Sequence, residues 1–179
     1  MQVHYVRLLH MKSERVLHTI DPVFNAETRV LLLGSFPSPK SREVGFFYGH
    51  PQNRMWRVLA TVMGEDAVPL TAEERTVFLL RNHLAMWDVI ESCFIEGASD
   101  ASIKDVVPNN LSRILDAAPI QVIFCTGAKA YQLYGRYQAH STGIPAIKLP
   151  STSGANAAWS FERLVEAYQV VAEAAVAKP

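Results

Sequence analysis

This sequence has no excess of positive or negative charge. Its 179 residues include 17 Lys plus Arg and 17 Asp plus Glu, so the formal net charge is zero. The chain therefore has no global basic field of the kind that attracts nucleic acids to many proteins. This absence does not exclude a nucleic-acid partner, because backbone N–H groups and Ser hydroxyls contact phosphates without adding formal charge.

Cysteine is scarce, and long apolar runs are missing. Cys93 and Cys125 lie far apart in the sequence, which provides neither a Cys-x-x-Cys metal pair nor a disulfide framework. No stretch resembles the apolar core of a signal peptide or approaches the ~18 to 20 apolar residues of a membrane span. We therefore expect a soluble, cytoplasmic protein with reduced core thiols and no contact with a membrane.

The motifs of several enzyme classes are missing as well. Walker A, Gly-x-Gly-x-x-Gly, His-Glu-x-x-His and nucleophile-elbow sequences do not occur. The six histidines show no metal-ligand spacing, which argues against a zinc deaminase. We expect neither a metal nor a cofactor.

Apolar residues make up 49% of the chain, whose length suffices for one good core and is short for two domains. We assign residues 30–179 to a single domain. Residues 1–29 show no sustained hydrophobic period and are expected to form an N-terminal arm laid over that domain. The sequence therefore predicts one globular unit.

Short apolar runs predict four buried strands, at residues 29–34, 83–87, 121–125 and 146–149. Helical spacing of apolar residues predicts helices at residues 54–63, 71–82, 109–118, 128–137 and 161–177. The polar, Ser-rich segment 88–108 is read as a connection. Strands that alternate with helices predict an α/β protein, a three-layer α/β/α sandwich with a central, mostly parallel four-stranded sheet.

The loop after the first strand carries the most informative residues. It reads Gly34-Ser35-Phe36-Pro37-Ser38, followed by Ser41 and by segment 45–56, which holds three consecutive aromatics and a His/Gln/Asn/Arg cluster. Such residues could stack a flat ring and hydrogen-bond its edge. They also fit an ordinary core, in which the aromatics pack inside and the serines form turns.

Two further loops follow strands at the same edge of the predicted sheet, where α/β proteins bind ligands. Segment 149–156 offers hydroxyls and free N–H groups that could contact phosphates. The turn Thr126-Gly127-Ala128-Lys129 begins a helix whose N-terminus could bind an anion, although an uncommitted connection between strand and helix explains it as well.

Taken together, these residues resemble the uracil-DNA glycosylase superfamily, and most of all its hypoxanthine-DNA glycosylase branch. In the related mismatch-specific uracil/thymine branch, a strand ends in Gly-Ile-Asn-Pro-Gly, followed by a Ser and later by Phe-x-x-Pro-x-Asn-Arg-Phe-Trp. Residues 34–38, Ser41 and residues 48–56 match that spacing without gaps. The similarity spans about residues 29–170. It implies an α/β/α fold and hydrolysis of an N-glycosidic bond in DNA.

Two residues depart from the mismatch-specific pattern. Phe36 stands where that branch has the Asn that positions the attacking water, and a phenyl ring cannot hydrogen-bond water. The Gly-Ser-Phe-Pro-Ser form resembles the hypoxanthine branch, which implies that the essential role passes to Asn53. Ala155 stands where the mismatch-specific branch wedges a Leu into the base stack. Either Asn156 helps to fill that gap, or the enzyme relies on a weak base pair such as hypoxanthine with thymine.

The resemblance implies a role for each loop. Asn53 is the expected catalytic residue, and it either orients the water or hydrogen-bonds the departing base. Ser35, Phe36, Phe47 and Tyr48 are expected to bind the base, with Tyr48 stacking on the flipped ring. Contacts to DNA are expected from Ser38, Ser41, Lys129, Ser151, Thr152, Ser153, Gly154, Ala155 and Asn156.

The resemblance therefore predicts a monomeric, monofunctional DNA glycosylase that acts on double-stranded DNA with a deaminated base. It is expected to release hypoxanthine from deoxyinosine preferentially and to leave an abasic site. Cleavage needs no strong base, because charge develops on the sugar and on the base. Asp88 and Glu91 could contribute, or they are solvated loop acids. The alternatives are a uracil or thymine mismatch glycosylase and a non-catalytic nucleic-acid-binding module.

Overall fold

A four-stranded parallel sheet forms the centre of the protein. The computed structural model describes residues 14–177. The sheet consists of β2 (Val30–Gly34), β3 (Leu84–Asp88), β6 (Val122–Thr126) and β7 (Ala146–Leu149), in the spatial order β3-β2-β6-β7. Neighbouring strands pair in parallel throughout. The central strand β2 is buried along its whole length, as its run of Val and three Leu predicts.

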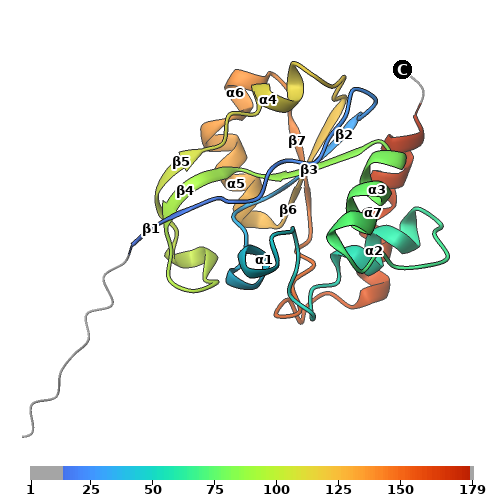
Figure 1. Cartoon of the computed structure of the whole chain (residues 1–179), viewed down its shortest axis with the longest axis horizontal. Coiled ribbons are helices and arrows are strands. Elements are labelled where there is room, and N and C mark those ends of the chain that lie inside the picture. Colours follow the sequence, from blue (N-terminus) through green and yellow to red (C-terminus); the bar gives the residue numbers. More distant parts are fainter. Residues whose placement is uncertain (1–13, 178–179) are drawn as a thin grey trace, which may run out of the picture.

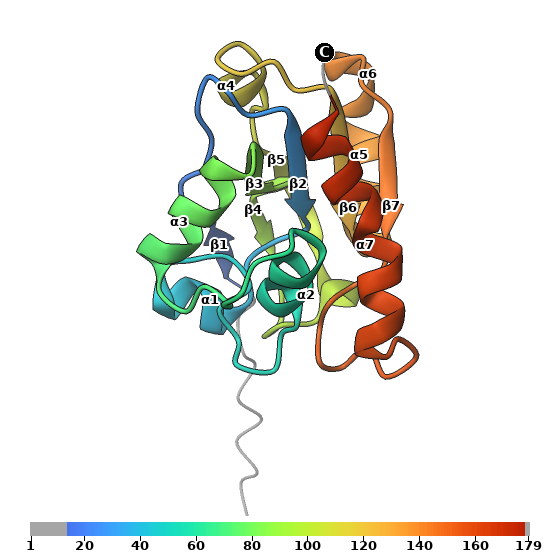
Figure 2. The same cartoon turned by 90° about the vertical axis from the view of Figure 1, so that its right-hand side faces the viewer.

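Helices cover both faces of this sheet, which confirms the predicted three-layer α/β/α arrangement. One face carries α2 (Met55–Val62), α3 (Ala72–Arg81) and α7 (Phe161–Val176), which lie together on the right in Figure 1 and towards the viewer in Figure 2. The other face carries α5 (Ala128–Tyr137). The core is therefore closed on both sides, and a ligand can reach the sheet only at its edges.

A second sheet lies on the same side as α5, in a segment that was expected to be a connection (Figure 1). It consists of β1 (Arg15–Leu17), β4 (Ile90–Phe94) and β5 (Lys104–Pro108), which pair antiparallel in the order β1-β4-β5. The interpretation of segment 88–108 as a polar connection is therefore wrong. Two register shifts interrupt the β4–β5 pairing, so no clean alternation of apolar and polar residues marks these strands.

The N-terminal part of the chain joins this second sheet. Residues 15–17 of the expected arm form β1, and the segment after them runs along β3, where Val23 pairs with Met86. Residues 1–13 of that arm lie outside the described residues. Residues 14–29, which showed no chemistry in the sequence, thus bring His18 close to the ends of the parallel strands.

Short helices differ from the sequence-based expectation. α4 (Ser112–Leu115) is much shorter than the helix predicted for residues 109–118. α1 (Pro39–Val44) and α6 (Ala139–Thr142) were not predicted. α1 begins where Ser38 accepts a hydrogen bond from a backbone N–H and a proline follows, which is a typical helix start.

The carboxyl ends of the four parallel strands meet at one edge of the sheet, and the loops that follow them converge there. This edge is where open α/β sheets bind ligands. The loop after β2, the end of β3, the end of β6 and the loop after β7 are thus brought together although they are far apart in the sequence.

Candidate active site

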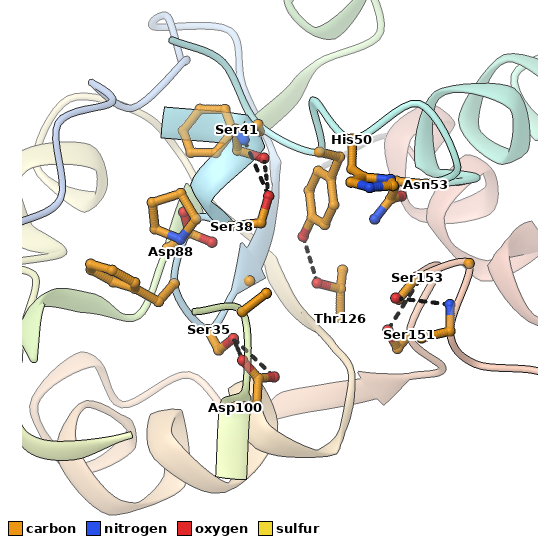
Figure 3. A pocket seen from close by; sticks show the side chains of 18 of the residues that line it. Ser35, Ser38, Ser41, His50, Asn53, Asp88, Asp100, Thr126, Ser151 and Ser153 are labelled. Carbon is orange, nitrogen blue, oxygen red and sulfur yellow. Dashed lines mark hydrogen bonds between the residues drawn. The ribbon is translucent and has the colours of Figure 1, made fainter. Parts of the chain in front are cut away.

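A cavity of about 360 Å³ opens at this edge of the sheet (Figure 3). Its volume lies within the ~300 to 1,000 Å³ range of small-molecule sites. The loop after β2, the segment before α2, the ends of β3 and β6 and the loop after β7 form its wall. Its polar side chains are Ser35, Ser38, Ser41, Tyr48, His50, Gln52, Asn53, Asp88, Asp100, Thr126, Ser151 and Ser153.

The floor of the cavity lies over Gly34, the last residue of β2. A Cβ atom added there would lie 2.3 Å from Oδ1 of Asp88 and 3.0 Å from the hydroxyl of Tyr48. These two polar groups therefore approach the backbone at the same point. Only a residue without a side chain leaves room for both.

Tyr48 forms one wall of the cavity. Its hydroxyl lies 2.6 Å from Oγ1 of Thr126, whose own hydroxyl donates to the carbonyl of Leu33 (3.3 Å). Tyr48 is therefore the donor in the first of these bonds. Burial raises the pKa of Tyr48 well above its usual value, and the nearby charge of Asp88 raises it further. Tyr48 thus stays a neutral phenol.

The neighbouring aromatic residues belong mainly to the core. Phe46 is 7% exposed and Phe47 is 1% exposed, and their rings pack edge to face. Phe36, in the loop after β2, is also buried. Of the three consecutive aromatics, the core interpretation is therefore correct for Phe46, whereas Phe47 belongs to the core and also lines the cavity, and Tyr48 lines the cavity. Phe36 likewise is buried and lines the cavity.

The amide of Asn53 is oriented by two donors from different parts of the chain. Its Oδ1 accepts hydrogen bonds from the backbone N–H of Met55 (2.9 Å) and from the hydroxyl of Thr152 (2.8 Å). Because a backbone N–H can only donate, its partner must be the amide oxygen, and the orientation of the amide is settled. The Nδ2 group has no partner among residues 14–177 and lies on the cavity side in Figure 3.

Arg54, the next residue, holds the loop after β7. Its guanidinium donates to the backbone carbonyls of Thr152 (3.3 Å), Ser153 (2.7 Å), Asn156 (3.2 Å) and Trp159. Its backbone N–H also donates to the Thr152 carbonyl (3.0 Å). The two loops that carry the predicted site residues are therefore joined into one rigid unit.

A buried His–Asp pair lies at the floor. His18 Nε2 is 2.8 Å from Oδ2 of Asp88, and the two side chains are 3% and 5% exposed. Nδ1 of the same imidazole accepts the backbone N–H of Ile20 (3.2 Å). The proton of the neutral ring is therefore on Nε2 and is donated to Asp88. Asp88 is thus not a solvated loop acid.

The serines of the first loop make hydrogen bonds close to the cavity. Ser38 Oγ accepts the N–H of Ser41 (3.1 Å) and donates to the hydroxyl oxygen of Ser41 (3.0 Å), which also accepts the N–H of Gly49 (3.0 Å). Ser35 donates to the carboxylate of Asp100 (3.2 and 3.3 Å), a residue that the sequence did not point to. These hydroxyls therefore shape the loop itself.

Most of the predicted site residues line the cavity. These are Ser35, Phe36, Ser38, Ser41, Phe47, Tyr48, Asn53, Ser151, Ser153, Gly154 and Ala155. Thr152 is 1% exposed and faces Asn53, the Asn156 amide donates to the Ser151 carbonyl (2.9 Å), and Lys129 lies at the start of α5, outside the wall. The roles of all the predicted residues in binding base or DNA stay predictions.

Within residues 14–177, no group of three or more His, Cys, Asp and Glu side chains is placed to hold a metal ion. In the same part of the chain, no helix is long and apolar enough to cross a membrane. Cys93 and Cys125 are free, buried thiols, as predicted, and burial raises the pKa of Cys125 to about 12.

Three comparisons relate this chain to known proteins. The profile of the uracil DNA glycosylase superfamily matches residues 22–172. The chain is 36% identical over 138 residues to a hypoxanthine DNA glycosylase of Methanosarcina barkeri, covering 75% of this chain and 85% of the relative. It is 33% identical over 144 residues to a hypoxanthine DNA glycosylase of Methanosarcina acetivorans, covering 79% of this chain and 89% of the relative.

A solved structure agrees with these relatives. The solution NMR structure of a proposed uracil DNA glycosylase from Methanosarcina acetivorans superposes with a TM-score of 0.75 at 30% identity. The match covers 88% of this chain and 98% of that one. With the cavity at the carboxyl edge of the sheet, these similarities show that the chain belongs to the uracil DNA glycosylase superfamily and is a DNA glycosylase.

Proposed function

We propose that this glycosylase hydrolyses the N-glycosidic bond of deoxyinosine in double-stranded DNA, which releases hypoxanthine and leaves an abasic site. The observation that carries the proposal is the free amide group of Asn53 at a cavity of about 360 Å³. Two relatives named hypoxanthine DNA glycosylase, at 36% and 33% identity, support the choice of base.

Asn53 offers hydrogen-bond donors and no free acceptor. Negative charge develops on the base as the glycosidic bond breaks, and donors aimed at that charge lower the barrier. Because Oδ1 is occupied by Met55 and Thr152, it is not available to accept a hydrogen bond from a water molecule. Of the two roles that the sequence left open, the contacts favour a hydrogen bond from Nδ2 to the departing base.

The remaining cavity residues fit a base that has rotated out of the duplex. Tyr48, Phe36 and Phe47 line the cavity and offer aromatic surface against which a planar ring packs. Ser151 and Ser153 stand at the cavity in the loop after β7, where hydroxyls can contact DNA phosphates. The damaged nucleotide is thus held from both sides.

The lining of the cavity supports hydrolysis without a Schiff-base intermediate. No lysine is found among the lining residues within 14–177, so no amine is placed to form a Schiff base with the sugar. The reaction therefore stops at the abasic site. We expect the enzyme to act as a monomer in the cytoplasm, where the thiols of Cys93 and Cys125 stay reduced.

A uracil glycosylase is the second candidate, because the solved structure with a TM-score of 0.75 is that of a proposed uracil DNA glycosylase. Uracil shows a carbonyl next to an N–H group, as hypoxanthine does, and would meet the same Asn53 donors. The two candidates differ in the size of the base that the cavity prefers.

Single-turnover cleavage of duplex oligonucleotides distinguishes these functions. The duplexes carry one deoxyinosine, deoxyuridine, deoxyxanthosine or G:T mismatch each, and strand breakage at the abasic site is measured after alkali. We expect deoxyinosine to react fastest. A faster reaction with deoxyuridine would assign the enzyme to uracil, and cleavage of none of the four would overturn the proposal in favour of binding alone, which affinity for abasic duplex would then show.

Replacement of Gly34 by Ala is expected to lower the rate on the preferred substrate by about tenfold, since closing a site by one methyl group costs about 1 to 3 kcal/mol. The added Cβ would lie 2.3 Å from the Asp88 carboxylate and would displace it from the cavity floor. Gly135→Ala in α5, where a Cβ meets nothing within 4 Å, is the matched control and should keep the wild-type rate. Equal rates for Gly34→Ala and wild type would show that the base does not reach this floor.

A further inference from the structure

The cavity contains one hydrogen-bond acceptor that the proposed chemistry leaves unused. Asp88 is buried at the floor, and its Oδ2 accepts a hydrogen bond from His18 Nε2 (2.8 Å). Its Oδ1 accepts no hydrogen bond from residues 14–177 and lies over Gly34 at the cavity surface. This oxygen keeps its capacity to accept and faces the cavity, so its position points to a donor on the bound base.

The carboxylate is held in place and cannot turn freely. His18 is fixed by the N–H of Ile20 at Nδ1, and its Nε2–H is directed at Oδ2 of Asp88. The imidazole also packs edge to face against Phe36 and Trp87, with ring centroids 6.0 and 6.2 Å apart. His18 is therefore a positioning residue, which leaves Oδ1 as the atom presented to the cavity.

An acceptor at the end of β3 and a donor in the loop before α2 thus face the cavity. Asp88 and Asn53 lie on opposite sides of it, with Thr126 between them in Figure 3. Hypoxanthine carries a donor, N1–H, next to the acceptor O6, whereas adenine carries an acceptor at N1 and a donor at its amino group. The pair of protein groups is complementary to the first pattern and opposed to the second.

We infer that Asp88 accepts a hydrogen bond from N1–H of the flipped base and so selects 6-oxopurines over adenine, an inference that rests on the proposed function. A carboxylate beside the base opposes the negative charge that develops there. Asp88 therefore contributes to the choice of base, and the rate of bond breaking depends on the donors of Asn53. Guanine shows the same edge but is paired strongly with cytosine, so its extrusion is less favourable.

Asp88→Asn gives a direct test, because it exchanges an acceptor for a donor. The Nε2–H of His18 requires an oxygen as its partner, so the amide turns its oxygen to His18 and its NH₂ group to the cavity. The probes are duplexes with deoxyinosine and with deoxynebularine, an unsubstituted purine whose N1 is an acceptor. We expect Asp88→Asn to lower the ratio of the two single-turnover rates by about 10- to 100-fold.

The control is Glu91→Gln, the same chemical change at an exposed acid in β4 that does not line the cavity. It should keep the wild-type ratio. His18→Ala should lower the ratio as well, because it removes the group that holds the Asp88 carboxylate in place.

An unchanged ratio in Asp88→Asn, with hypoxanthine still released by the wild type, would overturn the role of Asp88 alone. Failure of the wild type to release hypoxanthine would overturn the proposed function instead. If Asp88→Asn cleaves neither probe, the affinities for uncleavable 2′-fluoroarabino duplexes with the same two bases measure the ratio. Equal discrimination in these affinities by the variant and the wild type would also reject the inference.

Discussion

Asn53→Asp is expected to slow base release by about 100- to 1,000-fold, the usual effect of removing one preorganised donor at a site of developing negative charge. The substitution is nearly isosteric. A carboxylate oxygen still accepts the hydrogen bonds of Met55 and Thr152, so the loops keep their contacts. What changes is the group at the cavity, which turns from a donor into a negatively charged acceptor. Single-turnover rates on the preferred duplex measure the loss.

The chain offers a matched control for this change. The Oδ1 of Asn110 also accepts the N–H of the residue two positions later, Ser112 (3.1 Å), but Asn110 is exposed and lies outside the cavity. Asn110→Asp should keep the wild-type rate. A rate for Asn53→Asp within about threefold of wild type would remove Asn53 from the catalytic machinery, since even one net hydrogen bond corresponds to a larger change.

Arg54→Ala is expected to lower the free energy of unfolding by about 3 kcal/mol and the Tm by roughly 6 to 12 °C. Its guanidinium donates to four carbonyls of residues 152–159, which lose their charged partner together. Arg54→Lys should recover little of this, because one ammonium group cannot match the planar set of donors. Thermal unfolding followed by circular dichroism measures both variants.

Arg54→Ala should also weaken binding to abasic duplex, since the loop after β7 is no longer held beside Asn53. Arg57→Ala is the control: this exposed arginine, one turn later, makes a single cation–π contact with Phe161 (4.6 Å). Loss of this contact in Arg57→Ala should lower the free energy of unfolding by less than about 1 kcal/mol. A Tm for Arg54→Ala within about 2 °C of wild type would show that other contacts hold the loop.

Elements with a local signal could be predicted closely. The parallel strands β2, β3, β6 and β7 are short apolar runs, and burial on both faces selects such runs. The helix after Thr71 begins with a capping box, in which Thr71 and Glu74 satisfy each other's backbone N–H groups. These features depend on residues a few positions apart, so their pattern is visible without the fold.

The second sheet lacked such a signal. β4 and β5 alternate irregularly because register shifts interrupt their pairing, and β1 is only three residues long. A short strand of this kind is stabilised by its neighbours in the sheet and not by its own composition. The pairing of β1 with β4 joins residues that are more than seventy positions apart.

The sequence by itself determined the layered fold, the family and the residue type at the expected catalytic position, because these depend on local apolar runs and on the unbroken spacing of residues 34–56. Only the tertiary structure decided what each polar group at the cavity can do. The Asn53 amide is turned by Thr152, and Asp88 is held by His18, across 99 and 70 positions of the chain. Whether a side chain donates, accepts or is held in place depends on the partner that the fold brings to it, and partners so distant leave no periodic mark in the sequence.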